Sequence, residues 1–163
     1  MDAHDETFLR QAIQLGRDAR ACGERPFGAV LVANGQIVAQ AGDQCRALSD
    51  PTAHAELRVI STYCQTTGTF SLDGYTLYSL TEPCVMCSGA IKWAQVSRVV
   101  FSVPQAMLQT ISGGLQKPTC DSLVNTGGRH IAVCGPYLLE EGLAVYRGFD
   151  FAQHRQHILY QQK

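Results

Sequence analysis

The sequence feature that most constrains the fold is a pair of short motifs, each placed where a turn leads into a predicted helix. His54-Ala55-Glu56 follows Asp50-Pro51-Thr52, and Pro83-Cys84-Val85-Met86-Cys87 follows a predicted strand. Cys84 and Cys87 lie about one helical turn apart, so both sulfurs can face one point at the start of their helix. A chain that brings these two helix starts together would gather three good metal ligands in one place.

These three ligands form a donor set suited to zinc. A catalytic zinc ion takes three protein ligands and leaves the fourth tetrahedral position for water. His54, Cys84 and Cys87 supply three, and a mixed thiolate and imidazole set favours zinc over iron or copper. Glu56 is not needed as a ligand, so we expect it to be the catalytic residue that moves protons. Both helix dipoles would direct their positive ends at the metal and favour thiolate over thiol.

Each motif alone has other interpretations. A Cys-x-x-Cys pair can be a redox pair or half of a structural zinc site, but the sequence holds no second Cys-x-x-Cys to complete a four-sulfur site. A His at a helix start is often an ordinary residue. A catalytically silent zinc-binding partner subunit is a further alternative, against which the retained Glu56 argues, because a structural site has no use for a free carboxylate.

The remaining sequence alternates predicted helices and strands, which indicates an α/β layered fold with helices on both faces of one sheet. Asn34-Gly35 predicts a tight antiparallel hairpin, and the later strand–helix–strand steps are expected to be parallel. The stretch Pro104 to Gly128 is predicted to be a loop region with one short helix. The predicted helices are 5–22, 53–63, 84–94, 140–151 and 153–160, with an interruption expected at Gly148. The predicted strands are 29–32, 36–39, 75–80, 96–103 and 129–134.

Size and composition predict a single domain over residues 1–163 and narrow the partners. The chain is 45% hydrophobic with a formal net charge of -1, which gives no long-range attraction to nucleic acid. The start of the chain lacks signal-peptide features, and no apolar run approaches the roughly 20 residues that span a bilayer. Seven cysteines without a framework spacing fit a reducing compartment. We therefore expect a cytoplasmic protein without a membrane partner.

Three segments carry a family resemblance: Pro26 to Val30, Asp50 to Glu56 and Thr81 to Ile91. In these segments the sequence resembles the cytidine deaminase superfamily, in the branch that holds tRNA adenosine, guanine and cytosine deaminases. The resemblance implies a three-layer α/β/α sandwich with a mixed five-stranded sheet, hydrolytic release of ammonia, and a homodimer with sites near the interface. It also implies that His54, Cys84 and Cys87 bind Zn²⁺ and that Glu56 shuttles protons.

The same resemblance assigns substrate contacts to a few residues. It implies that Phe27 lies beside the bound base and that the amides of Ala55 and Cys84 contact the substrate and the attacking oxygen. The family usually has Asn where this chain has Asp43, and an ionised Asp only accepts hydrogen bonds. Either the substrate presents extra N–H groups to Asp43, or Asp43 is held protonated, or Gln44 takes over, or Asp43 is a solvated turn residue. The working hypothesis is that Asp43 reads an N–H of the base.

The substrate expected from the sequence is a free nucleobase or related amino-heterocycle, with guanine favoured. Phe27 in place of a smaller aliphatic residue resembles guanine deaminases, and the near-neutral charge suits a small molecule. The alternative is a tRNA adenosine deaminase, supported by the partly basic segment 147–163, although such a segment is more often a solvated helix. Pro104 to Met107 is neutral, so no substrate residue is assigned there. Trp93 is expected in the core or a dimer interface.

Overall fold

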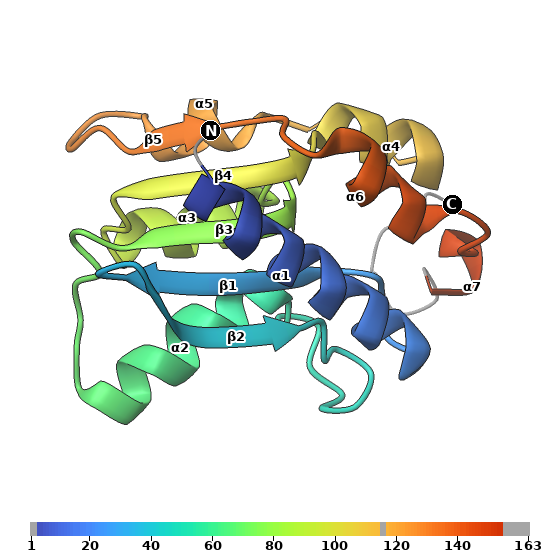
Figure 1. Cartoon of the computed structure of the whole chain (residues 1–163), viewed down its shortest axis with the longest axis horizontal. Helices are drawn as coiled ribbons and strands as arrows, with labels where there is room; N and C mark the ends of the chain where they lie inside the picture. Colours follow the sequence, from blue (N-terminus) through green and yellow to red (C-terminus); the bar gives the residue numbers. More distant parts are fainter. Residues whose placement is uncertain (1–2, 115–116, 155–163) are drawn as a thin grey trace, which may run out of the picture.

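The computed structural model describes residues 3–114 and 117–154, and within them one five-stranded sheet lies between two layers of helices (Figure 1). The strand order is β2-β1-β3-β4-β5. The strands are β1 (Gly28–Ala33), β2 (Gln36–Gly42), β3 (Thr76–Thr81), β4 (Arg98–Val103) and β5 (Ala132–Cys134). The helices are α1 (Ala3–Ala21), α2 (Ala55–Thr67), α3 (Val85–Trp93), α4 (Gln105–Ser112), α5 (Cys120–Val124), α6 (Leu139–Tyr146) and α7 (Phe151–His154).

Strand alternation divides the core into two halves, one on each face of the sheet. In β1, Leu31 packs with α2, α3 and α5, whereas Val30 packs with α1 and α6 on the opposite face. Val99 and Val100 of β4 separate in the same way, because successive side chains of a strand point to opposite faces. Figure 1 shows α1 and α6 in front of the sheet and α2 and α3 behind it. The expected α/β/α sandwich is confirmed.

The sheet is mixed, as the resemblance implied. β1 pairs antiparallel with both β2 and β3, and the β3–β4 and β4–β5 pairs are parallel. The hairpin turn holds Asn34 at φ 50° and Gly35 at φ 72°, which is the left-handed backbone that Asn-Gly tolerates. β3 and β4 therefore end at the same edge of the sheet, and β3 leads there into α3. The hairpin and the parallel steps are confirmed.

The stretch Pro104 to Gly128 contains two helices, α4 and α5, where a loop region with one short helix was expected. In α4 the polar Gln105 and Gln109 are buried, whereas the apolar Met107 and Ile111 are exposed. The helix predicted over 140–151, with an interruption at Gly148, ends at Tyr146: Arg147 leaves the helical region and Gly148 takes φ 68°. Trp93 is 88% exposed and so does not pack in the core, and its expected place in a dimer interface stays a prediction.

Two further findings complete the description. The predicted helix 153–160 and most of the partly basic segment 147–163 lie outside the described residues after His154. In the part of the chain that the structure describes, every helix is too short or too polar to cross a membrane.

Candidate metal centre and active site

Two helix N-termini meet behind the sheet, and each places a metal-ligand side chain at its N-cap. His54 caps α2 with φ -65° and ψ 151°, and Cys84 caps α3 with φ -71° and ψ 174°. Neither side chain accepts a capping hydrogen bond, although N-cap side chains commonly do so. Both are therefore free to serve the centre, and the N–H groups of each first turn lie beside it.

The three expected ligands come together in the structure. His54 Nδ1 lies 3.6 Å from Cys84 Sγ and 3.7 Å from Cys87 Sγ. One ligand atom from each residue lies within 4.8 Å of the other two. For a tetrahedral zinc ion with ordinary bond lengths, nitrogen and sulfur ligands sit about 3.6 Å apart. The residues present therefore fit a zinc ion without rearrangement.

The two cysteines differ in their pKa shifts, and the shift of Cys84 favours metal binding. The hydrogen bond from the Cys87 thiol, with help from His54, lowers the pKa of Cys84 to about 3, against the effect of burial. The same hydrogen bond, together with burial, raises the pKa of Cys87. Cys84 is therefore a thiolate at neutral pH, and thiolate is the form that binds metal.

Glu56 is buried on the first turn of α2 with its carboxylate against this cluster. Its Oε1 accepts a hydrogen bond from Ser79 Oγ at 3.1 Å, and its Oε2 lies 3.6 Å from Cys87 Sγ. Burial, and then the negative charge of Cys84, raise the pKa of Glu56. A raised pKa makes the carboxylate a stronger base, which suits a group that takes and returns a proton in general acid–base catalysis.

Phe27, Tyr146 and Phe151 form an aromatic wall, which belongs to the core half that α1 and α6 cover. The Phe27 ring packs 6.2 Å from that of Tyr146, and Tyr146 packs 5.9 Å from Phe151. The Tyr146 hydroxyl forms a buried hydrogen bond with Thr81, which leads into Glu82-Pro83-Cys84. Tyr146 therefore connects Phe27 with the loop that carries a metal ligand.

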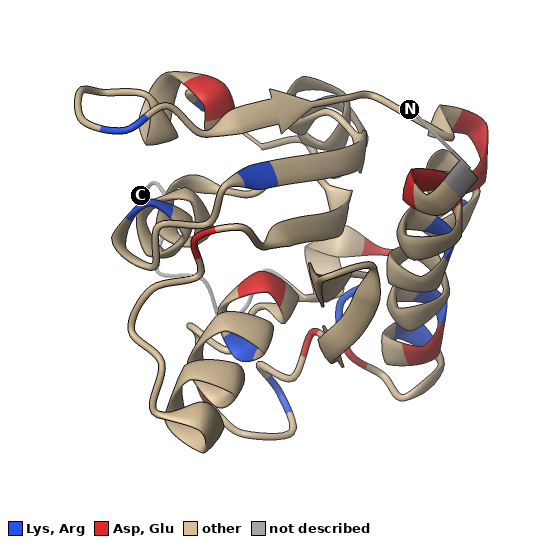
Figure 2. Cartoon of the chain, turned by 60° about the vertical axis from the view of Figure 1, so that its left-hand side comes forward, with Lys and Arg blue, Asp and Glu red and all other residues tan. Residues whose placement is uncertain are grey.

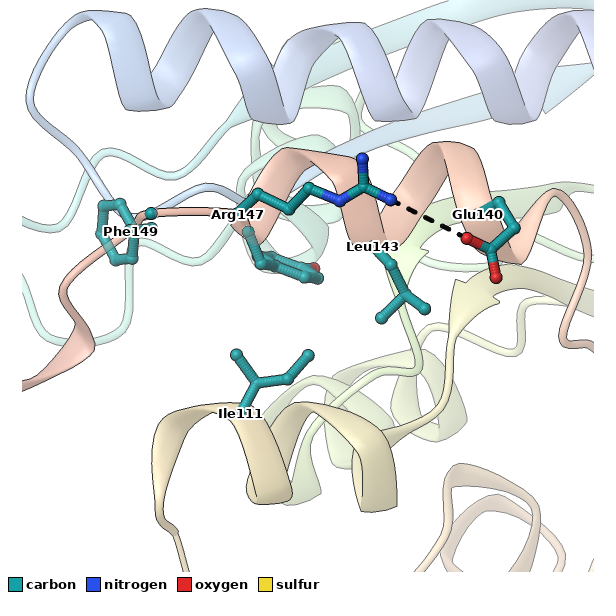
Figure 3. Close-up of a pocket in the computed structure, with 7 residues that line it drawn as sticks. Ile111, Glu140, Leu143, Arg147 and Phe149 are labelled. Carbon is teal, nitrogen blue, oxygen red and sulfur yellow. Dashed lines mark ion pairs between the residues drawn. The ribbon is translucent and has the colours of Figure 1, made fainter.

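Tyr146 also lines a cavity of about 410 Å³ between α4 and α6. Figure 3 shows Ile111 of α4 opposite Leu143 of α6, with Arg147 reaching along α6 to Glu140. The other lining residues are Gly148 and Phe149. None of the residues expected to bind metal or substrate lines this cavity, so it adjoins the candidate site only through Tyr146.

Comparison with known proteins agrees with this geometry. Residues 2–103 match the model of the cytidine and deoxycytidylate deaminase zinc-binding region. The chain belongs to this deaminase family. The family comprises zinc-dependent hydrolases that act on C–N bonds, and it accounts for the zinc cofactor.

Relatives within the deaminase family differ in their named substrates. A tRNA-specific adenosine deaminase of Bacillus subtilis is 44% identical over 97 residues, a match that spans 60% of either chain. A probable cytosine deaminase of Schizosaccharomyces pombe is 34% identical over 89% of this chain and 91% of its own length. The crystal structure of guanine deaminase from Bacillus subtilis, at 32% identity, covers 91% of this chain and 96% of its own with a TM-score of 0.63.

The structure also shows where the residues that were expected to contact the substrate lie. Ala55 is the first residue of α2 and Cys84 caps α3, so both amides lie in helix first turns at the cluster. Phe27 lies on the segment that enters β1. Asp43 is not a solvated turn residue: it is buried and forms an ion pair with Arg25 at 2.7 Å.

Sequence reasoning missed three residues of the site: Ser79, Tyr146 and Arg25. Ser79 stands out as a buried polar residue in the apolar strand β3, which is a signal that the sequence offers. Tyr146 lies 65 residues beyond its hydrogen-bond partner Thr81, and no motif marks it in the sequence. Arg25 could have been suspected from Asp43, because a buried carboxylate needs a partner.

Proposed function

We propose that this protein is a zinc-dependent hydrolytic deaminase that releases ammonia from a free nucleobase-like heterocycle, with guanine as the favoured example. The observation that carries the proposal is the buried cluster of His54, Cys84 and Cys87 with the Glu56 carboxylate 3.6 Å from Cys87 Sγ. Three ligands and a neighbouring free carboxylate are the parts of a catalytic zinc site rather than of a closed structural one.

The roles of the residues follow from their chemistry. His54, Cys84 and Cys87 would hold the zinc ion, which when bound supplies Lewis acidity and lowers the pKa of water toward about 7. Glu56 takes a proton from the water that attacks the amine-bearing ring carbon. Glu56 then delivers protons to the ring nitrogen and to the leaving amine. The carbon gains the oxygen of the water, its C–N bond breaks, and ammonia leaves. One water is consumed for each ammonia released, so no other reactant is needed.

Substrate positioning in this proposal uses the two helix starts and the aromatic wall. The amides of Ala55 and Cys84 would donate hydrogen bonds to the substrate and to the negative charge that develops on the attacking oxygen. Phe27, supported by Tyr146, would contact the base. The raised pKa of Glu56 supports its role as proton carrier.

A small-molecule substrate is supported by the charge of the chain. The formal net charge is -1, and Figure 2 shows the Arg residues of α1 on the same helix as Asp and Glu, so α1 presents no purely basic surface. A tRNA adenosine deaminase is the second candidate, favoured by the Bacillus subtilis relative of that name. Binding to RNA would require basic and aromatic groups around a flipped base.

An ammonia-release screen on the zinc-loaded protein tests the proposal. The panel contains guanine, adenine, cytosine, isocytosine, aminotriazines, pterins and their nucleosides, and a tRNA anticodon stem-loop. Release from a free base and not from RNA is the expected result. Release from the RNA alone would establish the second candidate. A zinc-replete protein that acts on no member would instead support a silent zinc-binding subunit.

Three accompanying expectations remain predictions. We propose a homodimer, for which the exposed Trp93 and Val85 on α3 offer an apolar surface, with 88% and 48% of their surfaces accessible. We propose a cytoplasmic location because all seven cysteines are free thiols. The single domain over residues 1–163 is supported by the one sheet that spans the described residues.

A further inference from the structure

A buried ion pair between Arg25 and Asp43 lies beside the candidate site. Asp43 Oδ2 accepts a hydrogen bond from Arg25 Nη2 at 2.7 Å, and Oδ1 is 3.4 Å from Arg25 Nε. The Asp43 side chain is wholly buried, and that of Arg25 is 13% exposed. A buried ion pair is costly to desolvate and is weak evidence for stability, so its retention beside a site suggests a function.

Asp43 has little capacity left for a substrate. Besides Arg25, its Oδ1 accepts the backbone N–H of Cys45 at 3.2 Å, and its Oδ2 lies 3.7 Å from the Cys45 thiol. Each carboxylate oxygen therefore already has two partners, which is its ordinary limit. Asp43 acts on Arg25 by fixing the plane of the guanidinium, and direct reading of a base N–H by Asp43 is disfavoured.

Arg25 retains an unused donor group at the site. Its Nε and Nη2 donate to Asp43, and Nη2 also lies 2.8 Å from Cys45 Sγ. Among the described residues, Nη1 has no hydrogen-bond partner. A guanidinium carries five N–H donors in a rigid plane, so the two on Nη1 remain available.

Arg25 lies close to Phe27, and its partner Asp43 lies close to His54. The guanidinium lies 5.7 Å from the centre of the Phe27 ring. One oxygen of Asp43, the Cys45 sulfur and a ring nitrogen of His54 lie within 4.8 Å of one another. The Arg25–Asp43 pair therefore lies between a proposed base contact and a proposed metal ligand.

We propose that Arg25, oriented by Asp43, is a specificity-determining residue whose Nη1 donates a hydrogen bond to an exocyclic carbonyl oxygen of the substrate. The inference rests on the proposed deaminase function and narrows its substrate to oxo-substituted amino-heterocycles, such as guanine or isocytosine. Adenine has no carbonyl oxygen, so the Arg25–Asp43 pair selects against it. A site built to hydrogen-bond a substrate group discriminates strongly against an analogue that lacks the group.

Matched substrates that differ in the exocyclic carbonyl oxygen, and in the ring N–H that accompanies it, test this assignment. Guanine is compared with 2-aminopurine, and isocytosine with 2-aminopyrimidine; within each pair the amine occupies the same position. The ratio of kcat/KM for the oxo compound to that for its partner is expected to be large for the native protein. In Arg25→Gln this ratio is expected to fall about 10- to 100-fold, the range for a lost hydrogen bond to a charged group.

Variants separate this role from simple destabilisation. Arg25→Gln leaves the buried Asp43 carboxylate without its partner, so the double variant Arg25→Gln/Asp43→Asn removes both charges together and is expected to show the same fall. Arg98→Gln is the matched control, because Arg98 is half-buried and bonds Asp5 at 2.7 Å but lies at the start of β4, away from the site. Its ratio is expected to equal the native one.

The outcomes are distinguishable from failure of the proposed function. Equal loss of kcat/KM for both members of a pair, with the ratio preserved, would overturn the role of Arg25. Equilibrium binding of guanine and 2-aminopurine to the zinc-loaded variants gives the same ratio without turnover, so an inactive protein still tests the contact. If Arg25→Gln weakened binding or kcat/KM only for guanosine monophosphate, and not for the bases, the Arg25 donor would be assigned to a phosphate. That result would overturn the assignment to the carbonyl oxygen.

Discussion

Replacement of Glu56 by Gln tests the proton-transfer role most directly. Gln keeps the size of the side chain and one oxygen that can accept the hydrogen bond from Ser79, which is 3.1 Å long in the native protein. An amide cannot take up a proton at neutral pH. A positioned acid–base group contributes about 10²–10⁴ in rate, and a loss of about 10³ corresponds to roughly 4 kcal/mol of barrier height. We expect kcat to fall by at least that factor.

The assay measures ammonia release together with zinc content per chain. Glu56→Gln should retain about one zinc per chain, because Glu56 is not among the three clustered ligands. The control is Glu82→Gln, which also neutralises a buried glutamate. Glu82 accepts the backbone N–H groups of Gln105 and Cys120 rather than contacting the cluster. This control should lose stability while its turnover per zinc stays within a few-fold of native.

Turnover of Glu56→Gln within tenfold of the native value, at full zinc content, would refute this reasoning. In that case another group must carry the proton. A loss of zinc together with turnover would instead make Glu56 part of the metal-binding set.

Three other predictions concern stability and reactivity. A chelator that removes zinc should lower Tm by roughly 10 °C in calorimetry, since a ligand at 1,000 times its Kd contributes about 4 kcal/mol; an unchanged Tm would contradict the metal cluster. Gly28→Ala places a methyl group against the Ala12 carbonyl and the Gly16 amide, so the free energy of unfolding in urea should fall by about 3 kcal/mol. At Gly89, in a helix, an added methyl group meets open space, so Gly89→Ala should raise the free energy of unfolding by about 0.5–1 kcal/mol. In the zinc-loaded protein, where the metal would hold Cys84, iodoacetamide at pH 8 should label the exposed Cys22 first and leave Cys120 unmodified, because burial raises the pKa of Cys120 to about 12. Mass spectrometry measures the order of labelling, and early modification of Cys120 would contradict this expectation.

Features set by local chemistry could be predicted from the sequence. Asn34-Gly35 determines its hairpin because both residues tolerate a positive φ. The two motif helices were placed by their spacing and by the turns before them, and they brought His54, Cys84 and Cys87 to one point. These predictions depend on residues within one helical turn of each other or on the spacing of metal ligands. Both can be recognised in a single sequence.

Features that depend on distant partners could not be predicted. Gln105 and Gln109 of α4 are buried, although a helix normally buries its apolar side chains. The apolar residues of the sequence therefore did not indicate which face of α4 is buried. The pairing of Asp43 with Arg25 could not be predicted, because it depends on how the chain enters β1. Tyr146 reaches Thr81 across 65 residues of sequence, and no local pattern reports such a contact.

The order of parts along the chain has a consequence for how such enzymes diversify. Both metal-binding helix starts and the strands β1 to β4 fall within residues 2–103, the part that matches the family model. Tyr146 and the helices from α4 to α7 come afterwards. Mutations in this later third can reshape the approach to the centre while the hydrolytic apparatus stays intact. Chimaeras joined after β4 are thus a natural way to exchange substrate preference among relatives, as recombination during evolution could also do.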